Sequence, residues 1–104
     1  MANWIDVGEV GEVPDGEIKV FTAEQDSVVV CRVEGQLHAA ANVCPHAGMP
    51  IGTGTLQGCV LTCPFHGYAY NITDGRNVDF ADDVPLSVVP VRETDGRIEV
   101  EIED

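Results

Sequence analysis

The sequence predicts an all-β domain, an antiparallel sandwich or barrel, and three observations support this. Glycine and proline divide the 104-residue chain into short pieces, with 11 glycines and 6 prolines in all. No segment shows the apolar spacing of an amphipathic helix of ordinary length. Short runs rich in β-branched residues follow one another closely and are separated by turn residues, as in small all-β domains. The length suits one domain with one hydrophobic core.

The first strands are expected between residues 18 and 41. Residues 18–21 and 28–33 are two β-rich runs, and the second reaches Glu34-Gly35 before a third run over residues 37–41. An acidic residue followed by glycine between two apolar runs is typical of a tight hairpin turn. The pattern therefore predicts an antiparallel hairpin directly before residue 42.

A second hairpin is expected at the end of the chain. Residues 88–92 and 97–101 are β-rich runs on either side of Asp95-Gly96. The last run alternates, which predicts a sheet with one face exposed to solvent; its apolar positions are Ile98, Val100 and Ile102. Pro90 interrupts the earlier run and predicts an edge strand or a bulge at that point.

The charge of the chain limits its partners and its compartment. Eighteen acidic residues against five basic ones give a net charge of -13. Such a chain repels nucleic acid and anionic membrane surfaces, so we expect neither as a partner. The first ten residues lack the basic and apolar segments of a secretory signal, which predicts a cytoplasmic protein. Four cysteines in that compartment indicate metal or redox chemistry rather than structural disulfides.

The middle of the chain differs in composition from both ends. Residues 35–73 contain no Asp, Glu, Lys or Arg, although they hold more than half of the glycines. Dense glycine and proline favour loops at the surface over a buried segment. We therefore expect a neutral, loop-built site on an acidic β scaffold, with its glycines bringing backbone close to the site.

Two short motifs inside this neutral segment carry metal-binding side chains. Cys44-Pro45-His46 and Cys63-Pro64-Phe65-His66 each offer one sulfur and one nitrogen. Two thiolates and two imidazoles suit either a tetrahedral zinc ion or a Rieske [2Fe–2S] cluster, which has two Cys on one iron and two His on the other. The alternating order of Cys and His favours the cluster, because zinc sites usually pair like with like. A zinc-stapled interaction module remains the alternative.

Extended to Gly48 and Gly67, these motifs resemble the two ligand loops of Rieske-type proteins. The whole chain is similar in length and layout to a small soluble Rieske ferredoxin. The resemblance implies a β-sandwich base, residues 1–41 and 78–104, with an inserted cluster-binding subdomain, residues 42–77. It also implies one [2Fe–2S] cluster, with Cys44 and Cys63 on the buried iron and His46 and His66 on the outer iron.

The differences from the family's high-potential members are also informative. Those members carry an extra cysteine in each loop, joined as a disulfide, where this chain has Met49 and Phe65. Tyr70 keeps a family tyrosine that donates to the cluster, whereas Tyr68 replaces a donating serine. Fewer donors to sulfur stabilise the reduced form less. The resemblance therefore implies the low-potential, oxygenase-associated branch, near the lower limit of about -150 mV for Rieske centres.

The function implied by the resemblance is one-electron transfer without catalysis. A monomeric carrier would take electrons from a flavin-dependent reductase and pass them to a terminal oxygenase. The alternatives are a small subunit of a larger redox enzyme, such as a nitrite reductase-like complex, and an oxidation sensor. We expect a neutral tip near Phe65 and Tyr68 to dock on partners with a basic rim.

Three further residues have simpler interpretations. Cys31 lies within an apolar run and is expected to be a small buried side chain. Cys59 is interpreted as a spare thiol, with a Cys31–Cys59 disulfide as the alternative. His38, in the strand before the first motif, is expected at the core or its rim rather than among the ligands.

Overall fold

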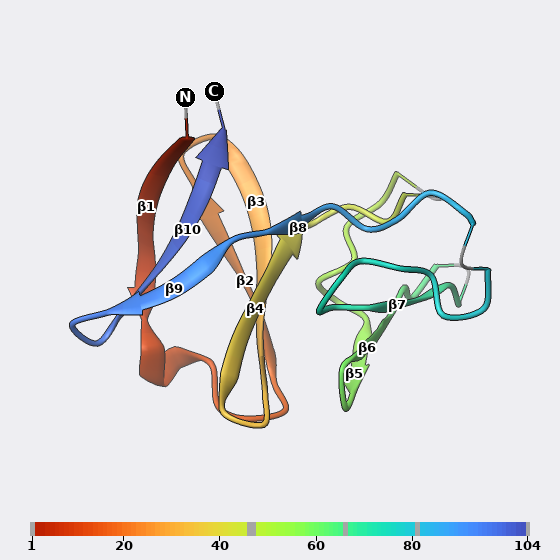
Figure 1. The fold of residues 1–104 in the computed structure, drawn as a ribbon, viewed down its shortest axis with the longest axis horizontal. Helices are drawn as coiled ribbons and strands as arrows, with labels where there is room; N and C mark the ends of the chain where they lie inside the picture. The colour runs from red at the N-terminus through yellow and green to blue at the C-terminus, as the bar shows by residue number, and fades with distance from the viewer. Residues whose placement is uncertain (1, 46–47, 66, 81, 104) are drawn as a thin grey trace.

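Two β-sheets stacked on each other form the base of the molecule, and a third, smaller sheet forms a tip beside it (Figure 1). The computed structural model describes residues 2–45, 48–65, 67–80 and 82–103. Among these, no helix is long and apolar enough to cross a membrane. The elements in chain order are β1 (Ala2–Glu9), the 3-10 turn η1 (Val10–Glu12), β2 (Ile18–Ala23), β3 (Asp26–Val33), β4 (Gln36–Ala41), β5 (Thr55–Gln57), β6 (Val60–Thr62), β7 (Ala69–Asn71), β8 (Val88–Val89), β9 (Val91–Thr94) and β10 (Arg97–Glu103).

All three sheets are antiparallel, which confirms the predicted fold class. The base contains one sheet with strand order β1-β10-β9 and another with order β2-β3-β4-β8. The tip sheet has the order β5-β6-β7. The chain leaves the base after β4 and returns to it at β8, so the tip is built between two strands that are neighbours in one sheet (Figure 1).

Both predicted hairpins are present, and their turns explain the residues found there. Glu34 and Gly35 have φ values of 50° and 81°, and Asp95 and Gly96 have 52° and 79°. Two consecutive left-handed residues match the right-handed twist of the strands that they connect. Pro90 lies between β8 and β9, where the chain passes from the edge of one sheet to the edge of the other. This confirms the prediction of an edge position.

The interior is divided into two clusters rather than the single core expected. The base core lies between the two base sheets and contains Val13, Phe21, Ala23, Val28, Val30, Ala39, Ile98 and Val100. The tip core lies between the base and the tip and contains Val29, Cys31, Ala40, Cys44, Ile51, Leu61, Cys63, Tyr70, Ile72 and Leu86. Because side chains alternate along a strand, β3 contributes Val28 and Val30 to one core and Val29 and Cys31 to the other. A strand covered on both faces accounts for its unbroken apolar run.

Asn42, directly after β4, attaches the tip to the base. Its Oδ1 accepts the backbone N–H of Ile51 at 3.0 Å and of Gly52 at 2.7 Å, and its Nδ2 donates to Ser27 Oγ at 3.0 Å. At Gly52 an added Cβ would lie 2.3 Å from Val20 Cγ2, so this backbone rests directly on the base. Gly52 therefore serves contact between tip and base.

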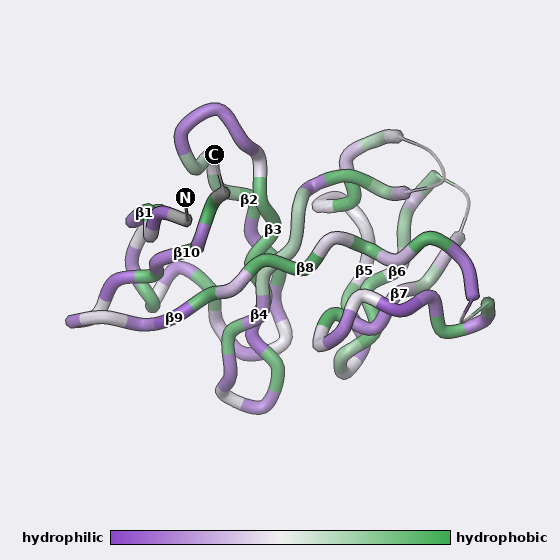
Figure 2. The backbone as a smooth tube through the Cα atoms, turned by 45° about the horizontal axis from the view of Figure 1, so that its top comes forward, coloured by the Kyte–Doolittle hydropathy of each residue, from purple (hydrophilic) through white to green (hydrophobic). Residues whose placement is uncertain are grey.

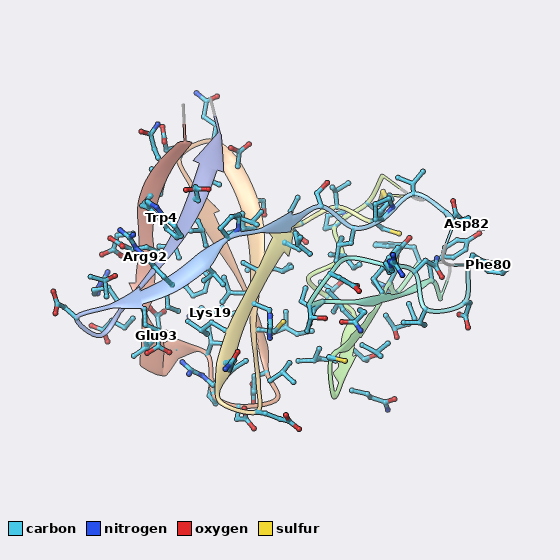
Figure 3. The ribbon with its side chains drawn as sticks, viewed as in Figure 1. Trp4, Lys19, Phe80, Asp82, Arg92 and Glu93 are labelled. Atoms are coloured by element: carbon cyan, nitrogen blue, oxygen red, sulfur yellow. The ribbon has the colours of Figure 1, made fainter. Side chains whose placement is uncertain are left out.

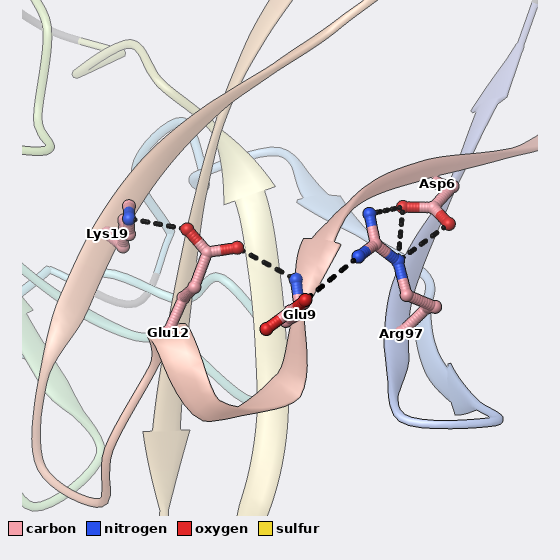
Figure 4. Close-up of polar contacts among 5 residues, drawn as sticks. All are labelled: Asp6, Glu9, Glu12, Lys19 and Arg97. Atoms are coloured by element: carbon pink, nitrogen blue, oxygen red, sulfur yellow. Dashed lines mark hydrogen bonds and ion pairs between the residues drawn. The ribbon is translucent and has the colours of Figure 1, made fainter.

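Exposed ion pairs connect β1, β2 and β10 on the outside of the base (Figure 4). Arg97 contacts Asp6 at 3.0 Å and Glu9 at 3.5 Å, and Glu12 contacts Lys19 at 2.7 Å. Hydrogen bonding to Arg97 lowers the pKa of the Asp6 carboxyl. Such solvent-exposed pairs add little stability, so the base depends mainly on its buried apolar side chains.

Candidate metal centre

The two cysteine loops are closed by the same pattern of backbone hydrogen bonds. The N–H of Cys44 donates to the carbonyl of Met49 at 2.8 Å, and the N–H of Cys63 donates to the carbonyl of Tyr68 at 2.7 Å. In both loops the bond joins a cysteine to the fifth residue after it. The glycine four residues after each cysteine donates back to the cysteine carbonyl, at 2.8 Å and 3.1 Å. Each cysteine is thus held at the mouth of a closed loop by two backbone hydrogen bonds.

These loops need glycine at one position. Gly48 and Gly67 have φ values of 65° and 73°, a left-handed conformation that other residues rarely adopt. Not every glycine of residues 35–73 serves the site as expected. Gly52 packs on the base, and an added Cβ at Gly54 would lie 2.0 Å from the carbonyl oxygen of Thr62. The expectation was therefore wrong for Gly52 and Gly54, because close packing of backbone elsewhere also requires glycine.

The two predicted sulfur donors converge in the tip core. Cys44 and Cys63 have no solvent exposure and belong to the same buried cluster. Cys44 follows β4 and the Asn42 attachment, whereas Cys63 follows β6 directly. The two predicted nitrogen donors, His46 and His66, lie outside the described residues. Their burial keeps water away from the thiols. Gly48, Pro64 and Phe65 of the same loops are exposed to solvent.

Tyr70, fully buried in β7, lies against the two cysteines. Its Oη is 4.0 Å from Cys44 Sγ. Burial raises the pKa of the Tyr70 hydroxyl, and the neighbouring Cys44 and Cys63 raise it further. The hydroxyl therefore keeps its proton and can donate to a thiolate at Cys44. The family tyrosine retained in the sequence thus occupies the position that the resemblance implied.

The residues around this point fit an iron–sulfur cluster. Two buried thiols supply the soft ligands that such clusters use. The Tyr70 hydroxyl lies beside one of them and can donate a hydrogen bond to its thiolate.

The segment after β7 forms a further wall that sequence reasoning missed. Val78 N–H donates to the carbonyl of Ala69 at 2.9 Å, and Leu86 N–H donates to the carbonyl of Gly75 at 2.8 Å. Val78 and Leu86 are therefore bonded to the tip, although residues 78–104 were expected in the base. The division into a base, residues 1–41 and 78–104, and an insertion, residues 42–77, remains a proposal.

This wall also changes the predicted charge of the tip. It carries Asp79, Asp82 and Asp83, and Figure 3 places Asp82 and Phe80 together at the end of the molecule away from the base. The tip as a whole is therefore acidic as well as apolar, because a charged segment that follows Thr73 in the sequence folds back to it. Phe65 and Tyr68 themselves belong to the uncharged residues 35–73, and a neutral docking contact there stays a prediction.

Apolar side chains exposed to solvent gather on the tip. Six of the eight large ones among the described residues lie there, so the tip rather than the base is the apolar surface. They are Val43, Met49, Phe65, Val78, Phe80 and Val84. Figure 2 shows hydrophobic and hydrophilic segments side by side at this end and mainly hydrophilic turns on the base. Tyr68, expected beside Phe65 on this surface, is instead half-buried against the tip core.

The remaining residues behave largely as expected. Cys31 is fully buried, and burial raises the pKa of its thiol to about 12. Cys59 is half-buried, and no disulfide joins it to Cys31. His38 is half-buried at the rim, where it lines a groove of about 600 Å³ together with Cys59 and Thr73.

Comparison with known proteins decides between the two metal-site interpretations. Residues 3–90 match the family described as the Rieske [2Fe-2S] domain. The chain belongs to the Rieske [2Fe–2S] family. Its cofactor is accordingly a [2Fe–2S] cluster, and the zinc alternative is set aside. The predicted fold is confirmed by the same relationship.

Individual Rieske relatives are similar over nearly the whole chain. Ferredoxin CarAc of Metapseudomonas resinovorans is 33% identical over 93% of this chain and 92% of its own length. The ferredoxin component of an alkene monooxygenase system from Xanthobacter autotrophicus is 30% identical over 91% of this chain and 78% of its own. A solved complex of reduced oxygenase and oxidized ferredoxin in carbazole 1,9a-dioxygenase contains a chain with a TM-score of 0.85 and 32% identity, covering 93% of this chain and 91% of that one.

Proposed function

We propose that this protein is a one-electron carrier that takes electrons from a flavin-dependent reductase and passes them to a terminal oxygenase. The observation that carries the proposal is the pair of matching loops that bury Cys44 and Cys63 beside Tyr70, in a chain related to ferredoxin components of oxygenase systems. The protein itself performs no catalysis in this scheme. Relatives serving a dioxygenase and a monooxygenase are about equally similar, so the substrate of the downstream enzyme is left open.

Four side chains would hold the cluster. Cys44 and Cys63 would bind one iron from the buried side, and His46 and His66 would bind the other. When bound, the cluster supplies reversible one-electron redox chemistry. The chain's own contribution is a rigid pair of loops, a buried hydroxyl directed at Cys44, and a covering of apolar side chains that excludes water.

The tip surface indicates the kind of partner that docks there. Phe80 is 59% exposed and Phe65 is 46% exposed, while Asp79 and Asp82 add exposed negative charge near Phe80. An apolar contact surrounded by carboxylates fits a partner with an apolar socket and a basic rim. The interface would be small and short-lived, as is usual for redox partners.

Electron transfer to an oxygenase tests the proposal. The reduced holoprotein is mixed in a stopped-flow instrument with the oxidised terminal oxygenase of carbazole 1,9a-dioxygenase, and the rate is followed as salt is raised. We expect transfer that slows with salt, because screening shortens the attraction between acidic tip and basic rim to about 8 Å at physiological ionic strength. A rate that rises with salt, or a protein that cannot be reduced and reoxidised by one electron, would contradict the proposal.

The proposal includes a monomer in the cytosol. The unlinked Cys31 and Cys59 thiols are consistent with a reducing compartment. The chain is similar to Ferredoxin CarAc over 92% of that protein's length, which favours a shuttle over a permanently bound subunit. Size-exclusion chromatography of the holoprotein checks this, since a persistent hetero-complex from the native host would favour the subunit alternative.

A further inference from the structure

Asn77 is the one buried polar residue in the described part of the chain, and its orientation is fixed by its neighbours. It is 2% exposed. Its Oδ1 accepts the backbone N–H of Asp79 at 2.9 Å and of Phe80 at 3.0 Å. Because only the oxygen of an amide side chain accepts hydrogen bonds, these two bonds identify which end of the amide is Oδ1. The Nδ2 group must therefore point the other way, into the protein.

That inward Nδ2 forms no hydrogen bond of regular geometry with any of the described residues. A buried amide N–H without a partner is costly, and most buried polar groups avoid this state. The side chain lies beside Tyr70, because Asn77 and Tyr70 are paired across an antiparallel bridge. The Asn77 side chain and the Tyr70 hydroxyl are close enough to interact by a side-chain hydrogen bond.

The neighbour on the other side of the Tyr70 hydroxyl is Cys44. The Tyr70 Oη to Cys44 Sγ distance is 4.0 Å, and either the hydroxyl or a protonated thiol could be the donor. A thiolate that binds iron has no proton, so the hydroxyl must then be the donor. A phenolic oxygen has one proton to give and lone pairs to accept another hydrogen bond. If an amide N–H donates to the Tyr70 oxygen, the proton of the Tyr70 hydroxyl remains available for the Cys44 sulfur.

We propose that Asn77 is a positioning residue that donates from Nδ2 to the Tyr70 hydroxyl and thereby directs the hydroxyl proton at Cys44. This inference rests on the proposed function, because it concerns Cys44 as a cluster ligand. Reduction adds negative charge at the site, so a donor to the thiolate stabilises the reduced form more than the oxidised form. Hydrogen bonds in a chain strengthen one another, so the Asn77 donor raises the reduction potential through Tyr70.

The test is the midpoint potential of the holoprotein in a double-mutant cycle. Asn77→Ala removes the amide and the turn that it caps, whereas Asn77→Ser keeps a hydroxyl acceptor for the turn but lacks the amide donor. Tyr70→Phe removes the hydroxyl through which Asn77 acts. Asn71→Ala is the matched control, because Asn71 Oδ1 caps a similar turn at Thr73 and is not fully buried.

We expect both Asn77 variants to shift the one-electron reduction equilibrium several-fold toward the oxidised form, where a tenfold shift corresponds to about 59 mV. In the Tyr70→Phe background the same substitutions should have no further effect, and Asn71→Ala should keep the parent potential. A parent-like potential in Asn77→Ser, or an equal shift with and without the Tyr70 hydroxyl, would overturn the inference.

Iron and acid-labile sulfide are measured on every sample, and this separates the two claims. A parent protein without a cluster would end the proposed function and the inference together. An intact cluster with a potential insensitive to Asn77 would end the inference alone. If one Asn77 variant loses iron, the other takes its place in the cycle. If both lose iron while Asn71→Ala and Tyr70→Phe keep the cluster, the inference is also overturned.

Discussion

The base core and the tip core are similar in size but differ in what holds them together. The base core is made of apolar side chains between two sheets whose strands pair over long registers. The tip core contains two cysteines and a tyrosine, and its strands β5, β6 and β7 have three residues each. Strands this short are rarely stable without other support. Burial of apolar side chains accounts for the base, whereas the proposed metal ligands would be needed to complete the tip.

The largest effect is expected from removal of a sulfur ligand. Cys44→Ser should abolish cluster binding, and amide hydrogen exchange should then rise over residues 42–77 far more than in β1, β3 and β10, since the loops depend on metal. The control is Cys59→Ser, which alters a thiol outside the ligand loops and should retain full iron content. Full iron content in Cys44→Ser, or exchange that rises equally in the base, would contradict the difference between the two regions.

Shortening a side chain in the base core should lower the free energy of unfolding by the same amount with and without the cluster. Ile98 is fully buried, and Ile98→Ala should lower the free energy of unfolding by about 2–5 kcal/mol in both the iron-loaded and iron-free protein. Trp4 reports on this region, because it is the only tryptophan and its ring lies 4.1 Å from the Arg92 guanidinium in the base (Figure 3).

The matched surface change is Val20→Ala, at a side chain that is 41% exposed, and it should cost no more than about 0.5 kcal/mol. A destabilisation by Ile98→Ala that appears only in the iron-loaded protein would show that the base is not independent of the tip.

A smaller effect is expected at high pH, from the strand shared by the two cores. The pKa of the buried Cys31 thiol rises from 9.0 to about 12. Above about pH 9 the unfolded chain releases this proton while the folded chain keeps it, so stability falls as pH rises, by about 1.4 kcal/mol per pH unit. Denaturant unfolding between about pH 8 and 11 measures this slope.

Cys31→Ala provides the comparison for that slope. The variant is expected to be somewhat less stable at neutral pH because a small cavity is left, but its stability should fall less steeply above about pH 9. Identical slopes for the variant and the parent protein would show that the thiol already ionises in the folded state.

The smallest expected effect concerns charge at the tip. The measured quantity is the ratio of two rates at which the reduced holoprotein is oxidised, one by the cation hexaamminecobalt(III) and one by the anion ferricyanide. Carboxylates near the electron-transfer site should raise this ratio, because they attract the cation and repel the anion. Asp82→Asn should reduce this ratio by roughly a few-fold. Asp95→Asn at the β9–β10 turn is the control, since asparagine tolerates its φ of 52° and this turn lies at the opposite end of the molecule (Figure 1). An equal response to both variants would mean that only overall charge matters.

Much of the base could be predicted from local sequence. The turns at Glu34-Gly35 and Asp95-Gly96 and the alternation around Ile98 depend on neighbouring residues alone. The two cysteine motifs were also visible, because their residue types and order carry chemistry. The two cores were not, since the double burial of β3 depends on a tip that folds from a distant part of the chain.

The parts that sequence reasoning missed come from long-range packing. Residues 78–84 contain no Cys or His and carry three aspartates, so nothing local places them beside an iron–sulfur site. Sequence alone indicates no more for Asn77 than a residue that favours turns. Asparagine side chains commonly accept hydrogen bonds from backbone N–H groups a few residues later, as Asn77 does from Asp79 and Phe80. Its inward amide becomes apparent only when Tyr70 and Cys44 are placed beside it.

The most direct test of the central claim is the composition and magnetic signature of the purified protein. We predict two irons and two acid-labile sulfides per chain. After one-electron reduction, the protein should give a rhombic paramagnetic signal with low average g, because two imidazole nitrogens would replace two thiolates on the reduced iron. The signal should be absent in Cys44→Ser and present in Cys59→Ser. Stoichiometric zinc without labile sulfide, or a cluster signal that persists without the Cys44 thiol, would contradict the claim that the two matching loops hold a Rieske centre.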